Sequence, residues 1–110
     1  MKYQHQELAS GRWEKLTFLE QMANIGSEVE RAILWREKGG DSYSQQAAIR
    51  ALELVDLTIS LPSNSKRLRE ITRVREVLVD YFFAENQYSS TDSLWRKYFY
   101  PFTFAARINK

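Results

Sequence analysis

The densest run of charged side chains lies between Lys66 and Glu76, where five basic residues accompany two acidic ones. On a helix, Lys66, Arg69 and Arg73 share one face, because residues three and four apart are neighbours there. Three cations along about 10 Å of helix match the spacing at which phosphates are engaged. Arginine also makes bidentate hydrogen bonds to phosphate. The row therefore predicts a face that binds RNA or DNA.

Arg96 and Lys97 complete the set of candidate nucleic-acid-binding residues. The alternative interpretation is that Glu70, Glu76 and acids on neighbouring helices neutralise the row. A charge run of this kind is commonly the solvated face of an amphipathic helix. Both interpretations are consistent with the sequence.

Six aromatic residues occupy the ten positions from Trp95 to Phe104, too many for one stripe of one helix. Helical spacing directs Trp95 and Phe99 to the core, so that Tyr100 and Phe104 project elsewhere. Tyrosine and tryptophan dominate interface hot spots, and nucleic-acid bases stack on the same rings. We favour a self-association interface; base stacking, or aromatic packing on both sides of a bent helix, is the alternative. The candidate interface residues are Trp95, Tyr98, Tyr100, Phe102 and Phe104.

The residues of the common catalytic and metal sites are missing. His5 is the only histidine and cysteine is absent, which leaves no parts for a Ser-His-Asp or Cys-His triad. Zinc and non-haem iron sites need several imidazole or thiolate ligands. We therefore expect no catalytic residue, no metal and no cofactor; an enzyme acting through carboxylates alone is the less favoured alternative. The acids expected on solvated helix faces are Glu28, Glu30, Glu53, Asp56, Glu76 and Asp80.

Four segments have apolar residues at intervals of three and four, the pattern of amphipathic helices. They span about residues 18–38, 43–60 and 65–84, and a last segment that begins after Ser90 or Thr91. Connections of roughly four to seven residues make sequential helices neighbours. The sequence therefore predicts an all-α fold, an antiparallel up-and-down four-helix bundle.

Residues at the ends of these segments set the expected boundaries. Thr17 with Glu20, and Ser42 with Gln45, have capping-box spacing. Gly39-Gly40 and Pro62 end the first two helices, because glycine adopts the left-handed conformation and proline lacks an amide hydrogen. For the same reason Pro101 is expected to kink or split the last helix.

The 110 residues are expected to form a single domain, 1–110, with residues 1–9 as a loose tail. The absence of cysteine and of an apolar leader predicts a cytoplasmic location. No apolar run approaches the ~20 residues of a membrane helix. Residues 1–60 hold seven basic and nine acidic side chains, whereas residues 61–110 hold nine and five. Any functional surface is therefore expected within residues 61–110.

In size and helix content the chain resembles the helical-bundle ribonuclease toxins of the HEPN superfamily. Those toxins use an arginine followed a few residues later by a histidine, and no arginine here has a histidine after it. The resemblance therefore implies a catalytically inactive HEPN-like or antitoxin-type partner. At the level of architecture alone the chain is also similar to the four-helix proteins encoded in ribosomal RNA intervening sequences. The basic, ring-forming accessory proteins of diversity-generating retroelements have a similar architecture.

Taken together, these patterns predict a non-enzymatic interaction protein. We expect it to self-associate as a homo-oligomer and to act as an accessory subunit of a nucleic-acid-handling complex with a protein partner. The alternative is direct RNA or DNA binding through the basic face of the third helix. No contact with a membrane is expected.

Overall fold

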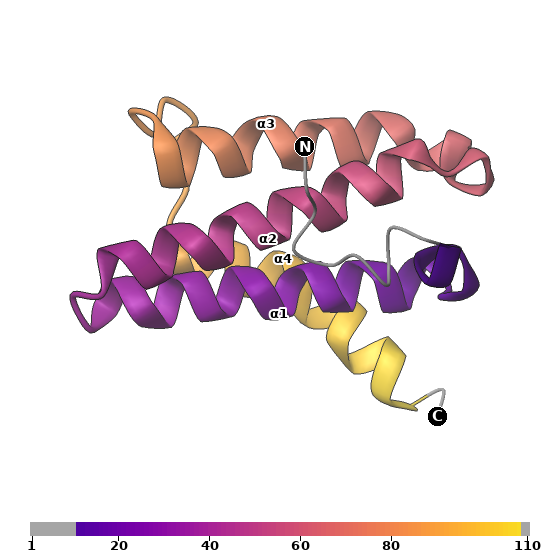
Figure 1. Ribbon diagram of the computed structural model, residues 1–110, viewed down its shortest axis with the longest axis horizontal. Helices are drawn as coiled ribbons and strands as arrows, with labels where there is room; N and C mark the ends of the chain where they lie inside the picture. Colours follow the sequence, from indigo (N-terminus) through magenta and orange to yellow (C-terminus); the bar gives the residue numbers. More distant parts are fainter. Residues whose placement is uncertain (1–10, 109–110) are drawn as a thin grey trace.

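The computed structural model describes residues 11–108, so the predicted tail of residues 1–9, with His5, lies outside the described residues. The described part of the chain is helical and has no strand, which confirms the all-α class. Figure 1 shows the chain turning back between successive helices, which pack into a bundle. The elements are η2 (Trp13–Lys15), α1 (Phe18–Glu37), α2 (Asp41–Ser60), η3 (Pro62–Arg67), α3 (Leu68–Phe83) and α4 (Asp92–Ile108).

The ends of α1 follow the predicted signals. The Thr17 hydroxyl accepts a hydrogen bond from the Glu20 amide at 3.1 Å, and the Glu20 carboxylate accepts one from the Thr17 amide at 2.9 Å. This capping box satisfies two amides that the first turn leaves unpaired. At the other end Gly39 has φ +81°, the left-handed conformation that favours glycine.

Two predicted helix starts are wrong. α2 begins at Asp41, because the Ser44 amide already bonds the Gly40 carbonyl at 2.9 Å, so Ser42 lies inside the first turn and forms no cap. α3 begins at Leu68 rather than near Ser65, since the residues after Pro62 form the tighter 3₁₀ helix η3. Proline at the first position suits such a helix because its missing N–H is not needed there.

α4 begins after Thr91, whose hydroxyl accepts a hydrogen bond from the Leu94 amide at 3.1 Å. It continues without interruption through Pro101 to Ile108, which excludes the predicted split, while the kink stays a prediction. In Figure 1 the C-terminal end of α4 extends away from the other helices. The residues near that end therefore have one side that no helix covers.

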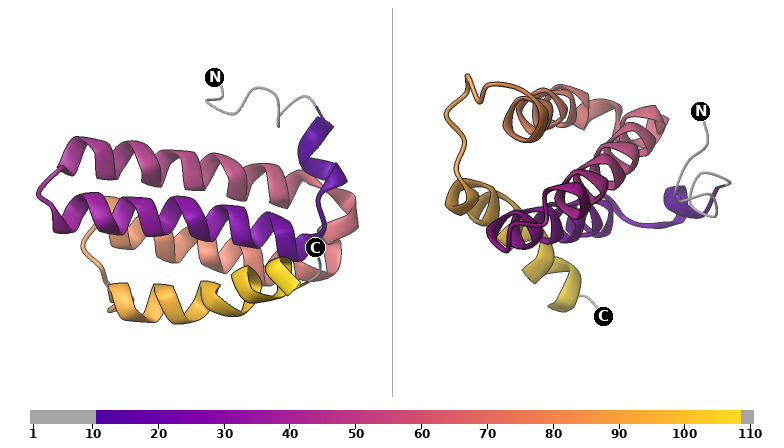
Figure 2. Two further views of the ribbon diagram at one scale, coloured as in Figure 1. Left: turned by 90° about the horizontal axis from the view of Figure 1, so that it is seen from below. Right: turned by 60° about the vertical axis from the view of Figure 1, so that its left-hand side comes forward.

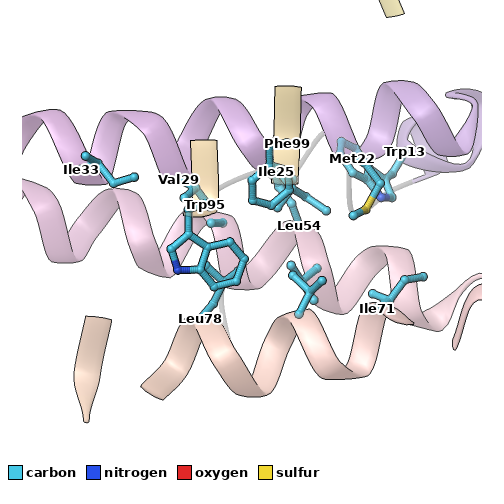
Figure 3. Packing of buried hydrophobic residues seen from close by; sticks show 13 residues of the cluster. Trp13, Met22, Ile25, Val29, Ile33, Leu54, Ile71, Leu78, Trp95 and Phe99 are labelled. Carbon is cyan, nitrogen blue, oxygen red and sulfur yellow. The ribbon is translucent and has the colours of Figure 1, made fainter. Parts of the chain in front are cut away.

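The backbones of α1 and α2, α1 and α4, and α2 and α3 approach closely, whereas those of α3 and α4 stay further apart. Figure 2 shows α4 lying against α1. Side chains occupy part of the space between α3 and α4, where Trp95 and Phe99 point from α4 into the core cluster with Leu78 (Figure 3). Trp95 is only 6% exposed, although its indole N–H has no hydrogen-bond partner among the described residues.

A buried polar network ties the short helices to the bundle. The Trp13 indole donates to the Thr58 hydroxyl at 2.9 Å, and the Asn64 amide donates to Gln21 Oε1 at 2.9 Å. Gln21 in turn donates to the carbonyl of Trp13 at 3.1 Å. Because buried polar groups are costly when unpaired, this closed set of partners fixes η2 and η3 against α1 and α2.

The contact between α1 and α4 depends on the absence of a side chain at Gly26. A Cβ at this position would lie 2.8 Å from both Cβ and Cγ of Phe99. The Phe99 Cβ is attached directly to the α4 backbone, so a side-chain rotation cannot relieve that contact. The missing side chain at Gly26 therefore lets α4 approach the backbone of α1.

We predict that Gly26→Ala lowers the free energy of unfolding by roughly 1–3 kcal/mol, the usual cost of overpacking a core. The direction of this change tests the contact, because replacing an interior helical glycine with alanine otherwise raises the stability of a helix by about 0.5–1 kcal/mol. Ser27→Ala, at the next and exposed position of α1, is the control and should change stability little. Chemical denaturation measures both; a stabilised Gly26→Ala protein would contradict the close α1–α4 contact.

Candidate functional site

Three of the five predicted interface residues pack in or against the core of the fold. Trp95 stacks on Phe99 with ring centroids 5.9 Å apart, and Phe102 meets Phe18 edge-on at 6.0 Å. Tyr98 is half-buried between Trp95 and Phe102, and its hydroxyl donates to the Glu70 carboxylate at 2.7 Å. Burial, reinforced by this hydrogen bond, raises the pKa of Tyr98. These contacts join α4 to α1 and α3, with Trp95 buried and Tyr98 and Phe102 partly buried against the core.

The other two, Tyr100 and Phe104, are on the surface with side chains 66% and 52% exposed. Their rings stack with centroids 6.1 Å apart. Ile108, one further turn along, is 64% exposed and continues the same line. Its place four residues after Phe104 is a signal that the sequence contained and that our prediction missed. Tyr100, Phe104 and Ile108 are called the outer stripe of α4 below.

A groove of about 580 Å³ between α1 and α4 lies beside Tyr100, and Ala23 and Gly26 are among its lining residues. Arg96 lines it too, and its guanidinium forms ion pairs with Glu30 at 2.8 Å and Glu37 at 3.5 Å. The hydrogen bonds that Arg96 donates to the Glu30 carboxylate raise the pKa of Arg96 above its usual value. Arg96 is therefore engaged within the fold.

The structure does not bring all five predicted nucleic-acid-binding residues together. Arg96 lies against the acids of α1, and Lys97 is exposed on α4. By contrast, Lys66, Arg69 and Arg73 line one shallow surface depression that runs along η3 and α3. These three residues are called the basic row below.

The acids expected to neutralise the basic row have other partners. Glu70 accepts from Tyr98 and lies 3.8 Å from Arg67, while Glu76 accepts from the Tyr88 hydroxyl at 3.0 Å. Within residues 11–108, no carboxylate forms an ion pair with a member of the basic row. The row therefore presents exposed positive charge, as a phosphate-binding surface requires.

Tyr88 is an aromatic ring in contact with the basic row, and the sequence did not point to it. The Arg73 guanidinium lies over this ring, 4.8 Å from its centroid. The side chain is 45% exposed, so part of the ring remains open to solvent. No periodic signal identifies Tyr88, because it lies in the connection between α3 and α4.

Three acids predicted on solvated faces are buried, which corrects the expectation for Glu28, Glu53 and Asp80. Glu28 pairs with Arg31 at 2.9 Å and with Arg50 of α2 at 3.1 Å. Burial of a carboxylate is tolerated when such hydrogen-bonded partners compensate for lost water. The buried acids thus have partners that the fold supplies.

Asp80 organises the connection that carries Tyr88. Its carboxylate accepts hydrogen bonds from the amides of Gln87 at 2.8 Å and Tyr88 at 3.0 Å. Asn86 adopts φ +55°, and its side chain donates to the Ser90 carbonyl and accepts from the Ser90 amide. Asparagine tolerates this left-handed conformation better than most residues. The connection is therefore held by specific hydrogen bonds.

A second polar cluster joins the ends of three helices. The Tyr81 hydroxyl of α3 donates to the Asp92 carboxylate at the start of α4, and Arg36 of α1 approaches the same carboxylate at 3.3 Å. The Arg36 guanidinium also lies 4.5 Å from the centroid of the Tyr81 ring. Burial, together with the hydrogen bond to Asp92, raises the pKa of Tyr81 to about 12.

No group of three metal-ligating side chains occurs among the described residues. No helix in the described part of the chain has the length and apolar character needed to cross a membrane. No protein-family profile, curated protein or solved structure matches the chain.

We predict that stability falls as the pH rises from about 10 to above 12. An unfolded tyrosine loses its proton near pH 10, whereas folded Tyr81 keeps it to about 12. The folded state therefore binds more protons in this window, and its advantage is lost as the pH rises through the folded pKa. Denaturation at several pH values should show a shallower decline for Tyr81→Phe; an unchanged decline would contradict the assignment.

Proposed function

We propose that this chain is a non-enzymatic interaction protein that self-associates through the outer stripe of α4. In this proposal the assembled bundle acts as an accessory subunit of a nucleic-acid-handling complex. The observation that supports self-association is the exposure of Tyr100, Phe104 and Ile108, three large apolar side chains one turn apart. Aromatic residues in such a position are enriched in interfaces.

The size of the outer stripe supports an interface of modest extent. Two aromatic residues and an isoleucine at these exposures present on the order of 350 Å² of surface. Exposed apolar patches of a few hundred Å² are commonly functional in monomeric proteins. Two copies, together with the polar rim around each stripe, approach the roughly 1,200 Å² of the smaller specific interfaces.

The occupant that fits the outer stripe best is a second copy of this chain. The stripe contains no charged residue, so a two-fold contact would pair apolar side chains with apolar side chains. An antiparallel pairing centred on Phe104 places Tyr100 of one copy opposite Ile108 of the other. A parallel pairing would set Lys97 against its own copy, which is unfavourable.

We predict that Tyr100→Ala combined with Phe104→Ala weakens self-association at least tenfold, because hot-spot aromatics contribute most of an interface's binding energy. Sedimentation velocity over a range of concentrations measures the effect. Tyr43→Ala with Phe83→Ala removes two exposed aromatic residues elsewhere and is the matched control. An oligomer that survives the α4 substitutions, or a parent protein that is monomeric at every concentration, would rule out this interface.

A second candidate function is direct binding of RNA or DNA by the basic row. The observation that favours it is the lack of an acid partner for Lys66, Arg69 and Arg73 among the described residues. Exposed cations that form no ion pair with a carboxylate can release the counterions of a phosphate backbone, which is the main source of non-specific affinity. This function is compatible with self-association, because the two surfaces lie on different helices.

We predict that Lys66→Ala with Arg69→Ala weakens binding to any nucleic acid and makes it less sensitive to salt. For single strands the logarithm of the binding constant changes by about 0.7 per phosphate contact for each tenfold change in salt. Two lost contacts should therefore reduce the slope by about 1.4. Lys15→Ala with Arg107→Ala removes the same charges from exposed positions outside the row. Equal slopes for the two double variants would refute binding by the row.

A further inference from the structure

We infer that the ligand of the basic row is single-stranded nucleic acid, with phosphates on Lys66 and Arg69 and one base stacked on Tyr88. This inference rests on the second candidate function and adds to it the class of strand and a base-binding residue. It is carried by the placement of an exposed, hydrogen-bonded aromatic ring at the end of a row of exposed cations.

The Tyr88 ring is held in place before any ligand arrives. Its hydroxyl donates to Glu76 at 3.0 Å, and its amide donates to the buried carboxylate of Asp80 at 3.0 Å. The first contact holds the hydroxyl and the second holds the backbone of the same residue, so the ring is fixed relative to α3. A ring ordered in advance loses little conformational entropy on binding, which increases affinity.

One face of the Tyr88 ring is covered by the Arg73 guanidinium, at 4.8 Å from the centroid. Because the side chain is 45% exposed, a planar group has access to the remaining surface of the ring. Base stacking on aromatic rings and on arginine is the general means by which proteins bind single strands. The Arg73–Tyr88 pair thus forms a platform for a base.

The charges along α3 divide the surface into a phosphate end and a base end. Lys66 and Arg69 lie at one end without an acid partner, whereas Glu76 lies beside Tyr88 at the other. The Glu76 carboxylate repels phosphate, so the backbone of a strand is favoured at the first end and an uncharged base at the second. The span from Lys66 to Arg73 is roughly 10 Å, room for two or three successive phosphates.

This arrangement selects against a duplex. In a double helix the phosphates lie outside and the bases are stacked on one another within, so no base face can reach Tyr88 without being unstacked. Unstacking a base from a duplex costs free energy that a single strand does not have to supply. A single strand presents its bases freely, and its phosphates can follow the basic row at the same time.

The test compares two labelled strands of about 15 nucleotides, within the usual range of site sizes. One is oligothymidine, and the other is an abasic strand with the same phosphates and no bases. Fluorescence anisotropy at low salt gives the affinity of the full chain for each. Tyr88→Leu should weaken oligothymidine binding about tenfold and leave abasic binding unchanged, since only stacking is lost.

Two variants separate stacking from structural damage. Tyr88→Phe keeps the ring and should retain oligothymidine affinity to within about twofold, a smaller change than the loss of one stacked base. Tyr43→Leu is the matched control, because Tyr43 is an exposed tyrosine that stacks on Trp35 at 4.6 Å, away from the basic row. Circular dichroism and thermal unfolding verify that each variant is folded.

The outcomes distinguish this inference from the function on which it rests. Loss of affinity for both strands in Tyr88→Leu, or equally tight binding of a duplex of the same length, would overturn the single-strand inference alone. No binding of oligothymidine, or binding that Lys66→Ala with Arg69→Ala leaves unaltered, would overturn nucleic-acid binding by the row as well. Oligouridine should behave as oligothymidine, because none of the proposed contacts involves the sugar 2′ position.

Discussion

The close approach of α1 and α4 at Gly26 is the constraint on which the surface of this bundle depends. With no Cβ at that position, Phe99 packs directly against the backbone of α1. The rotation of α4 about its axis is then determined: Trp95 and Phe99 point inward, and Tyr100 and Phe104 point outward. The same rotation sets Arg96 over the acids of α1. A different rotation would exchange the buried and exposed aromatic residues of α4.

A buried polar group likewise sets the arrangement of the connection between α3 and α4. Asp80 is removed from water because two amides of the following connection satisfy its carboxylate, and that connection then places Tyr88 over α3. Glu76 accepts from the Tyr88 hydroxyl, and Glu70 accepts from Tyr98 and pairs with Arg67; neither acid forms an ion pair with the basic row. The basic row therefore keeps its exposed positive charge.

Much of the fold was predictable from local pattern. Apolar spacing located all four helices, and α1 began at the Thr17 capping box and ended before Gly39 as expected. The start of α2 was misplaced because Gly40 supplies the first helical carbonyl, which makes a side-chain cap at Ser42 unnecessary. η3 was missed because the Asn64 side chain stabilises it by bonding to Gln21, which lies on a different helix. A short helix such as η3 cannot be predicted from neighbouring residues when a side chain on a distant helix stabilises it.

For the candidate surfaces, the sequence by itself determined which residue types are available and how they repeat along each helix. It placed Tyr100 and Phe104 away from the core, and Lys66, Arg69 and Arg73 on one face, because helical periodicity is a local property. Only the tertiary structure decided which of the charged residues remain free. Arg96 forms an ion pair with Glu30, 66 positions earlier in the chain, whereas no member of the basic row forms an ion pair with an acid among the described residues. Ion pairs between helices depend on how the helices pack, so the spacing of residues within a single helix cannot predict them.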